Sequence, residues 1–240
     1  MHLFVSDGAV HGQQIALQGE EAARAFQKGL RSGMSFTALD GSGWALDVEV
    51  VESGPGLCYG RVVGRHLAAE RRSKVTLYQA MLHPSDFRRL LGLATALGVV
   101  AFQPVISDGS VLPRLDEEGR PEGELEWPLL IRDAAETAGR GLLPRVEPPL
   151  LLDAAMDQAH GAGARLIVDA AGGSLEAALA DRPFSLACFL PPPGGFTPEE
   201  LQGAAAHGLR RVAPPEASPD PIQPAVALLR RIYDLLEEAR

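Results

Sequence analysis

The sequence predicts a mixed α/β protein that changes character near residue 72. Before that point, short apolar runs are separated by turns rich in Gly and Asp, which is typical of a small β-barrel. From Ser73 onward, strand-like runs alternate with amphipathic helical segments, which favours a mostly parallel sheet with flanking helices. We therefore expect a barrel domain at 1–72 and an α/β domain at 73–240.

The N-terminal part contains five candidate strands and one helix. Turn signals such as Asp7-Gly8 and Asp40-Gly41-Ser42-Gly43 separate the strands. The helix is expected at about Glu20–Leu30. The strands are expected at His2–Val5, Gln13–Leu17, Met34–Leu39, Trp44–Val51 and Leu57–Arg65.

The second part opens with a strand at Lys74–Met81 and a helix that follows Pro84. Ser85 is the N-cap candidate of this helix, apolar residues recur at helical spacing, and Gly98 ends it. The next strand is expected at Val99–Ile106. Pro104 indicates an edge or terminal position, because proline donates no ladder hydrogen bond.

Further elements continue the alternation. The segment Arg114–Glu126 carries six carboxylates and two arginines, which indicates a solvated loop. Thr197-Pro198-Glu199-Glu200 forms a capping box that starts a helix. Other helices are expected at Trp127–Gly139, Ser174–Ala180 and Pro224–Glu238, and buried strands at Leu166–Ala170 and Ser185–Leu190.

Composition narrows the classes of function. The formal net charge is −9, and residues 73–240 hold fifteen Lys/Arg against twenty-three Asp/Glu. Nucleic-acid-binding proteins usually carry a basic surface, so this balance speaks against strong non-specific RNA binding. Cys58 and Cys188 lie in apolar runs and are expected to be buried thiols. No apolar run is long enough to span a membrane, and the expected location is the cytoplasm.

A set of short motifs, spread over the chain in a fixed order, carries a resemblance to a known family. The strongest piece is Pro192 with Gly194-Gly195-Phe196, where paired glycines let backbones or a flat ligand approach closely. The others are Gly19-Glu20-Glu21-Ala22, Leu30-Arg31, Asp40-Gly41-Ser42-Gly43, Gln79-Ala80, Ala94-Thr95-Ala96-Leu97-Gly98-Val99 and Ala134-Ala135-Glu136-Thr137-Ala138-Gly139-Arg140.

With these motifs the chain resembles the 16S rRNA uracil-N3 methyltransferases, the RsmE family of the SPOUT superfamily. The resemblance implies a PUA-like β-barrel followed by a SPOUT-type α/β domain with a deep C-terminal trefoil knot. It also implies a homodimer, formed through the knot face and the last helix, that methylates a uridine of the small ribosomal subunit with S-adenosylmethionine.

The resemblance also assigns site residues. Leu190, Pro192, Gly194 and Gly195 correspond to cofactor-binding positions. Arg31 and Arg140 correspond to RNA-facing positions. Arg140 is expected to face RNA or the dimer partner, with a solvated arginine as the alternative, and the alternative for Arg31 is a structural salt bridge. No residue is assigned as catalytic, and no metal ligand is expected.

The chain departs from the family pattern at the cofactor loops. Pro191-Pro192-Pro193 replaces Gly-Pro-Glu, and the second loop, 214–224, holds five prolines and lacks two arginines and a glutamate of the family. Proline has no N–H to donate, and each lost hydrogen bond costs on the order of 1 kcal/mol. Three such losses weaken binding by roughly a thousandfold.

Three functions therefore stay open from the sequence. The chain is an active methyltransferase with a rebuilt site, a non-catalytic RNA- or ribosome-binding relative, or a structural dimer that has lost the cofactor. His83 and Asp86 are candidates for acid–base work. The alternative is that Asp86 favours the helix N-terminus electrostatically and that His83 is a surface residue. Asp169 ends a strand, where a lone carboxylate is more often a turn residue than a catalyst.

Overall fold

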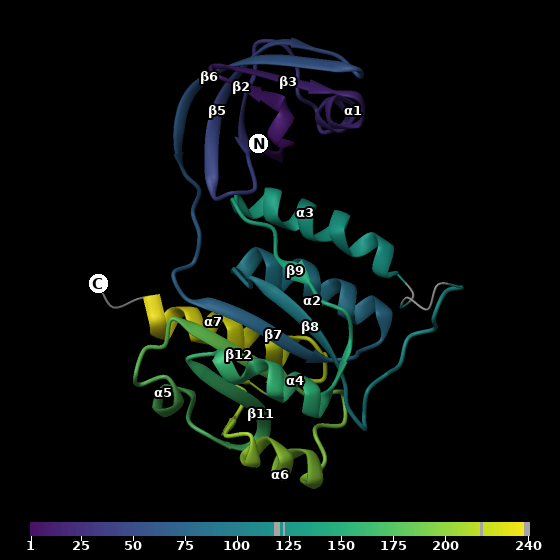
Figure 1. Ribbon diagram of the computed structural model, residues 1–240, viewed down its shortest axis with the longest axis vertical. Coiled ribbons are helices and arrows are strands. Elements are labelled where there is room, and N and C mark those ends of the chain that lie inside the picture. Colours follow the sequence, from purple (N-terminus) through teal and green to yellow (C-terminus); the bar gives the residue numbers. More distant parts are fainter. Residues whose placement is uncertain (118–120, 122, 217, 238–240) are drawn as a thin grey trace. The chain divides into compact units, whose positions relative to one another are not determined.

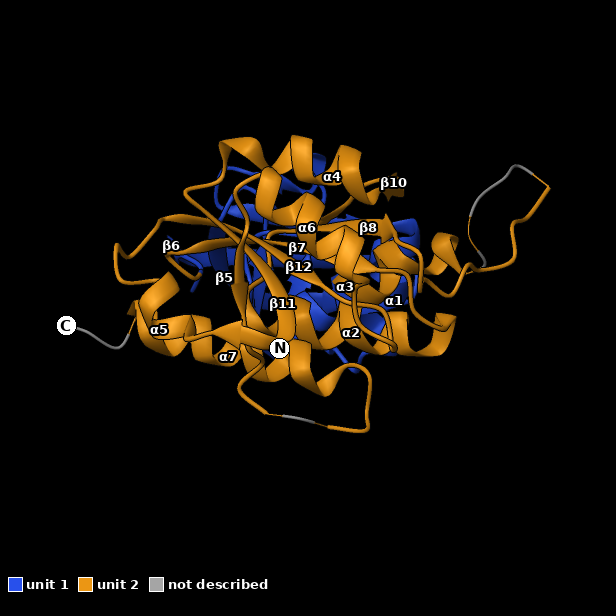
Figure 2. Cartoon of the chain, turned by 90° about the horizontal axis from the view of Figure 1, so that it is seen from below, with its two compact units in different colours: residues 1–70, 132–143 blue, residues 71–131, 144–240 orange. Residues whose placement is uncertain are grey.

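The computed structural model describes residues 1–117, 121, 123–216 and 218–237 (Figure 1). The chain forms two compact units (Figure 2). Unit 1 comprises Met1–Glu70 and Arg132–Leu143, and unit 2 comprises Arg71–Ile131 and Pro144–Arg240. The segment Arg132–Leu143 thus belongs with the N-terminal residues, whereas the sequence placed it in the second domain.

Unit 1 is a six-stranded, barrel-like sheet in the order β1-β4-β5-β6-β3-β2. β1 and β4 are parallel, and the other neighbours are antiparallel. Each of the five expected strands is present, as is the helix α1 (Gly19–Gln27), and only the two-residue β2 was not expected. The strands are β1 (His2–Phe4), β2 (Val10–His11), β3 (Gln14–Gln18), β4 (Ser35–Leu39), β5 (Trp44–Ser53) and β6 (Leu57–Leu67).

Buried ionic contacts tie the segment Arg132–Leu143 to the rest of unit 1. The side chain of Glu136 is only 2% exposed; it accepts a hydrogen bond from the Phe4 backbone N–H (2.8 Å) and ion pairs with Arg24 and Lys28. Glu70 accepts from Arg140 (2.8 Å) and from the Leu142 backbone N–H (3.0 Å). These contacts satisfy the buried charges, so the segment is an integral part of unit 1.

Unit 2 contains a parallel sheet in the order β10-β8-β7-β12-β11-β13, with β9 also paired to β8. All its described pairings are parallel, which confirms the expected doubly covered α/β arrangement. The strands are β7 (Lys74–Ala80), β8 (Ala101–Ile106), β9 (Arg145–Val146), β10 (Leu150–Leu151), β11 (Ala164–Gly173), β12 (Ser185–Leu190) and β13 (Arg210–Val212).

The expectation that Pro104 marks an edge strand was wrong. β8 pairs with β7 on one side and with two short strands on the other. β9 pairs with β8 at 101–102 and β10 pairs with it at 105–106, so Pro104 falls in the gap between them. In that gap the Gln103 side chain donates to the Pro148 carbonyl (2.6 Å), and the proline does not interrupt a ladder on that side.

Helices flank the sheet of unit 2 (Figure 1). α2 begins two residues earlier than expected, because His83 is the N-cap and Pro84 occupies the first turn. Ser85 is therefore not the cap. The capping box of Thr197 and Glu200 is confirmed. The helices are α2 (Pro84–Leu97), α3 (Trp127–Ala138), α4 (Leu152–Gln158), α5 (Leu175–Ala178), α6 (Pro198–Ala206) and α7 (Gln223–Glu237).

The last helix is buried along its apolar stripe. Val226, Leu229, Ile232 and Leu236 are all buried within the chain, and the last three belong to the same cluster as α2 residues. This stripe is therefore used in the core of the chain, and a dimer contact through the last helix would use its exposed face. The expected helix end, Glu238, lies outside the described residues. No described helix combines the length and apolarity needed to cross a membrane.

Candidate cofactor cleft

A cleft of about 530 Å³ lies in unit 2 at the carboxyl end of β12 and beside residues 168–170 of β11. This edge of a parallel sheet is where α/β proteins commonly bind small ligands. Segments far apart in the sequence line the cleft: β7 with Gln79, residues 168–170, the loop 190–196 and the loop 214–225. Leu190, Pro192, Gly194 and Gly195, the four residues expected to bind cofactor, all line it.

The first loop is fixed by backbone and side-chain contacts. The Gly195 N–H donates to the Pro192 carbonyl (3.0 Å), and Gly195 has φ +84°, a conformation that favours glycine. The buried Gln79 amide donates to the Ala80 carbonyl (2.9 Å) and to the Pro191 carbonyl (3.3 Å). These hydrogen bonds fix the corner that the three consecutive prolines form. The cleft beside this corner stays open.

The second loop is tethered through Asp220. Its carboxylate ion pairs with Arg89 of α2 (2.8 Å) and accepts a hydrogen bond from the Ile222 N–H (3.2 Å). The hydrogen bonds from Arg89 and Ile222 lower the pKa of Asp220 below its ordinary value. Ile222 itself is fully buried. The proline-rich loop thus has one ionic and one apolar anchor, and both lie beside the cleft.

The end of β11 approaches the chain after β13 very closely. A Cβ on Gly172 would lie 2.3 Å from the Val212 carbonyl carbon and 2.6 Å from the Ala213 nitrogen. The Ala213 N–H donates to the Gly173 carbonyl (2.9 Å) beside this approach. Only glycine fits at position 172, and this packing places residues 168–170 against the cleft.

The chemistry of the cleft is dominated by backbone carbonyls and proline rings. Seven of the seventeen lining residues are proline, so the lining is poor in N–H donors. Asp169 is the single ionisable residue among them, and Gln79 and Ser218 add neutral polar side chains. Such a lining suits a largely apolar ligand whose polar edges present donors.

Two further expected site residues lie in unit 1 and have structural partners. Arg140 is 3% exposed, and Glu70 binds its guanidinium. A buried, paired arginine presents no surface to RNA, so the expectation for Arg140 was wrong. Arg31 is exposed, but its guanidinium stacks on the Phe26 ring (3.8 Å) and donates to the Phe26 and Leu30 carbonyls.

The acid–base candidates near α2 also have structural roles. The His83 ring accepts a hydrogen bond from the Ser85 N–H (3.4 Å), and Asp86 ion pairs with Arg89 (3.2 Å). Both residues stabilise the first turn of α2. The sequence did not indicate the Arg89–Asp220 pair, because its partners are 131 residues apart. The sequence does hold a signal for Gln79 as a residue of the cleft, because it is a polar residue near the end of an apolar strand.

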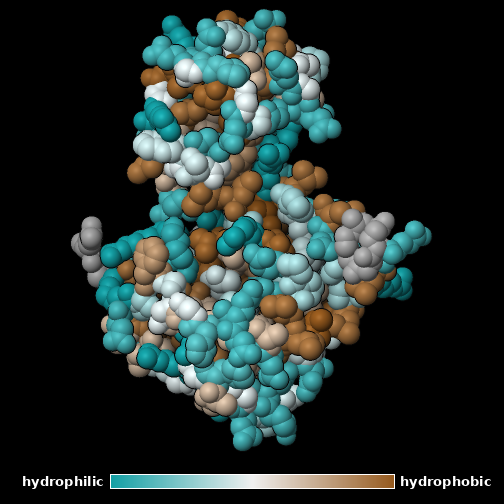
Figure 3. Space-filling view, in the orientation of Figure 1, coloured by the Kyte–Doolittle hydropathy of each residue, from teal (hydrophilic) through white to brown (hydrophobic). Residues whose placement is uncertain are grey.

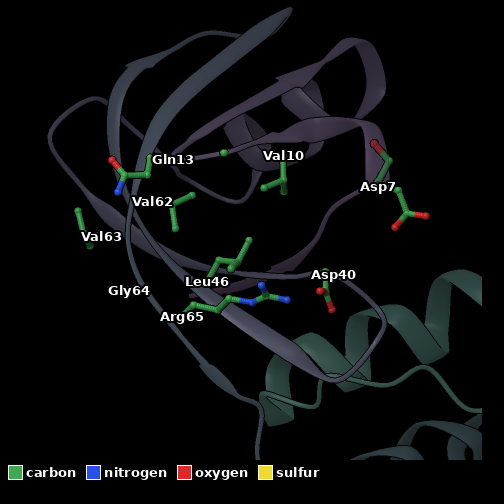
Figure 4. A pocket seen from close by; sticks show the side chains of 11 residues that line it. Asp7, Val10, Gln13, Asp40, Leu46, Val62, Val63, Gly64 and Arg65 are labelled. Carbon is green, nitrogen blue, oxygen red and sulfur yellow. The ribbon is translucent and has the colours of Figure 1, made fainter.

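A second cavity, of about 460 Å³, lies in the barrel of unit 1 (Figure 4). Its floor is apolar, with Leu46 and Val62, and Asp7, Asp40 and Arg65 lie around it. Arg65 stacks on the Trp44 ring at 4.3 Å. Two carboxylates beside one cation do not favour a phosphate, and the cavity lacks the strand-end loops found in unit 2. The cleft of unit 2 is therefore the stronger candidate for a small-ligand site.

Comparison with known proteins agrees with this fold. The chain matches a putative methyltransferase from Legionella pneumophila, whose structure contains S-adenosylmethionine, with TM-score 0.82 and 20% identity over 96% of both chains. It matches the ribosomal RNA small subunit methyltransferase E from Neisseria gonorrhoeae, also with S-adenosylmethionine, with TM-score 0.82 and 21% identity over 96% of this chain and 97% of that one. These likenesses establish the fold.

A sequence relative and a family model give information on the family in addition to the fold. Ribosomal RNA small subunit methyltransferase E from Synechocystis is 27% identical over 194 residues, 77% of this chain and 60% of the relative. The chain thus spans 60% of that relative's length. The fold is that of an α/β protein with a cleft beside its parallel sheet. The RNA methyltransferase domain model matches residues 69–213, and this chain belongs to that family.

Proposed function

We propose that this protein is an S-adenosylmethionine-dependent methyltransferase that acts on N3 of a uridine in small-subunit rRNA. The observation that carries the proposal is the single cleft built by both expected cofactor loops, with Leu190, Pro192, Gly194 and Gly195 in its wall. Its volume of about 530 Å³ lies within the ordinary range of small-molecule sites. The cofactor supplies the methyl group on a sulfonium centre, and the cleft binds and orients it.

The proline-rich loops favour a weakened site over a lost one. Both loops have anchors, through Gln79 and through Asp220, so the cleft is already formed before a ligand arrives. A formed site avoids the entropic cost of ordering loops on binding. The missing N–H donors lower affinity by about tenfold for each lost hydrogen bond, so we expect saturable but weak binding.

The proposed RNA substrate is supported by family membership more than by charge. In unit 1, four cations are bound in ion pairs: Arg24 and Lys28 with Glu136 and Asp133, Arg61 with Glu49, and Arg140 with Glu70. Paired cations contribute little to phosphate binding. This observation weighs against the alternative, a non-catalytic relative that binds RNA through its barrel.

Calorimetric titration of the full chain with S-adenosylmethionine tests the proposal, followed by transfer of labelled methyl groups to rRNA. We expect binding of one cofactor per chain and label on uridine. Gly194→Leu should abolish binding, because a Cβ there meets nothing within 4 Å and the new side chain enters the cleft. Gly161→Leu is the matched control, since its Cβ also meets open space and it does not line the cleft.

The outcomes separate the alternatives. Binding without methyl transfer would favour the non-catalytic relative. No binding by the wild-type chain would leave the structural dimer as the better account.

We propose that the protein is a homodimer. The stripe of α7 is buried within the chain, so the exposed face of α7 and other exposed apolar residues are the available contact surfaces. Leu112, Leu115, Leu125 and Leu129 are each at least 60% exposed, which is typical of an interface. Figure 3 shows apolar side chains among polar ones on the face that it presents. Light scattering of Leu125→Glu/Leu129→Glu should report a monomer if these residues form the contact.

A further inference from the structure

Asp169 has an unusual position in the cleft. It is the single ionisable residue among those that line the cavity, and its side chain is 20% exposed. Its two contacts both use Oδ2, which accepts from the Ala171 N–H (3.1 Å) and from Arg211. Oδ1 has no partner among the described residues. One carboxylate oxygen is therefore held and the other is left to accept a hydrogen bond.

Arg211 decides what kind of ligand group this oxygen suits. The guanidinium of Arg211, on β13, ion pairs with Asp169 and does not line the cleft. The pair is close to neutral as seen from the cavity, so its attraction for a cationic sulfonium is weak. Asp169 therefore acts as an oriented hydrogen-bond acceptor. The ligand groups that match it are neutral donors such as hydroxyls.

We propose that Asp169 Oδ1 accepts hydrogen bonds from the ribose hydroxyls of a bound nucleoside and that Arg211 is the positioning residue for it. This inference rests on the proposed function, because it takes an adenosyl cofactor as the ligand. Asp169 lies within β11, which continues to Gly173, and a carboxylate that lines a ligand cleft is well suited to a ribose hydroxyl, as in dinucleotide-binding folds. Since the proline loops are poor in donors, this acceptor supplies a large share of the polar recognition.

The inference predicts selectivity for ribonucleosides over deoxynucleosides. Titration calorimetry of the full wild-type chain with S-adenosylhomocysteine should give about tenfold or tighter binding than with its 2′-deoxy or 3′-deoxy analogue. Equal affinity for the parent compound and both analogues would overturn the inference, whatever any variant does. No binding of any of these ligands or of S-adenosylmethionine would overturn both this inference and the proposed function.

Variants locate the effect at Asp169. Asp169→Ala should bind S-adenosylhomocysteine about tenfold or more weakly than the wild type does. For the analogue that lacks the hydroxyl contacted by Asp169, the variant and the wild type should bind with equal affinity. Arg211→Ala keeps the acceptor, so it should bind more weakly but still prefer the ribose form. A loss in Asp169→Ala that is equal for parent and analogues would contradict the inference. So would a loss confined to the cationic S-adenosylmethionine, since that would make Asp169 a counterion.

Discussion

Glu136 belongs to a motif of the family resemblance, but its role in this chain is structural. It lies in the segment Ala134–Arg140, which carries part of the family resemblance, yet its carboxylate is buried between Arg24, Lys28 and the Phe4 N–H. A buried charge without its partner is strongly unfavourable, so each member of this network depends on the others. The Glu136 position of this motif therefore stabilises the packing of unit 1.

Replacing Glu136 tests this assignment. Glu136→Gln keeps the shape but leaves two cations near a neutral amide, and we expect a loss of about 3 kcal/mol in the free energy of unfolding. Asp133→Asn is the control, because Asp133 binds the same cations but its side chain is 59% exposed. It should cost about 1 kcal/mol or less. Denaturant unfolding measures both, and equal losses would count against the network.

Gly172 makes a second residue-scale prediction. Gly172→Ala places a methyl group against backbone atoms of Val212 and Ala213, which cannot move like a side chain. We expect a loss of about 2 kcal/mol or more, as in other overpacked sites. Gly194→Ala should leave thermal unfolding unchanged, because its Cβ meets open space. If Gly172→Ala unfolds like the wild type, the close approach is not rigid.

At the scale of elements, the loop 214–224 depends on α2. Arg89 reaches Asp220 from this helix, and the pair holds the loop beside the cleft. The pKa of Asp220 is lowered by the hydrogen bond from Arg89, so the carboxylate stays charged in the folded chain. This tether is complete above the ordinary pKa of 3.8 and is lost only as the pH falls through the lowered value.

Removing the tether should affect the ligand more than the fold. We expect Arg89→Ala to weaken cofactor binding several-fold at neutral pH with little change in thermal unfolding, because exposed ion pairs contribute little to stability. Arg88→Ala is the matched control, since Arg88 pairs with Glu126 and not with the loop. NMR titration should also show a higher pKa for Asp220 in Arg89→Ala. An unchanged affinity would mean that the prolines alone fix the loop.

At the scale of the whole molecule, the two units are not two consecutive pieces of sequence. Unit 1 takes in Arg132–Leu143, and α3 begins with residues of unit 2 and continues into unit 1. A fragment cut after the predicted boundary at residue 72 would lose the partners of Arg24, Lys28 and Glu70. It would also expose Phe4 and Leu39, which pack with Ala135.

We therefore expect residues 1–72 alone to fold poorly. Circular dichroism and NMR should show a largely disordered or aggregating fragment, and linking 132–143 to its C-terminus should restore dispersed signals. The same link with Glu136→Gln and Arg140→Gln is the control and should restore little. A well-folded 1–72 fragment would show that the added segment is dispensable.

The sequence by itself determined the elements and their class. Periodicity, capping residues and glycine stops are local signals, so the five barrel strands, α2, α6 and the buried strand Ser185–Leu190 could be read directly. The resemblance pointed to the loop 190–196, which lines the cleft of unit 2, because its glycines favour a conformation that local residues encode. The trefoil knot stays a prediction of that resemblance.

The tertiary structure decided what the residues do. Whether Arg140 faces RNA or Glu70, and whether Pro104 interrupts a ladder or falls in a gap, depends on partners dozens of positions away. The same holds for Arg89 with Asp220 and for Arg211 with Asp169. Local propensity contains no information on such distant pairs, because burial and charge pairing arise only when the sheet assembles its strands side by side.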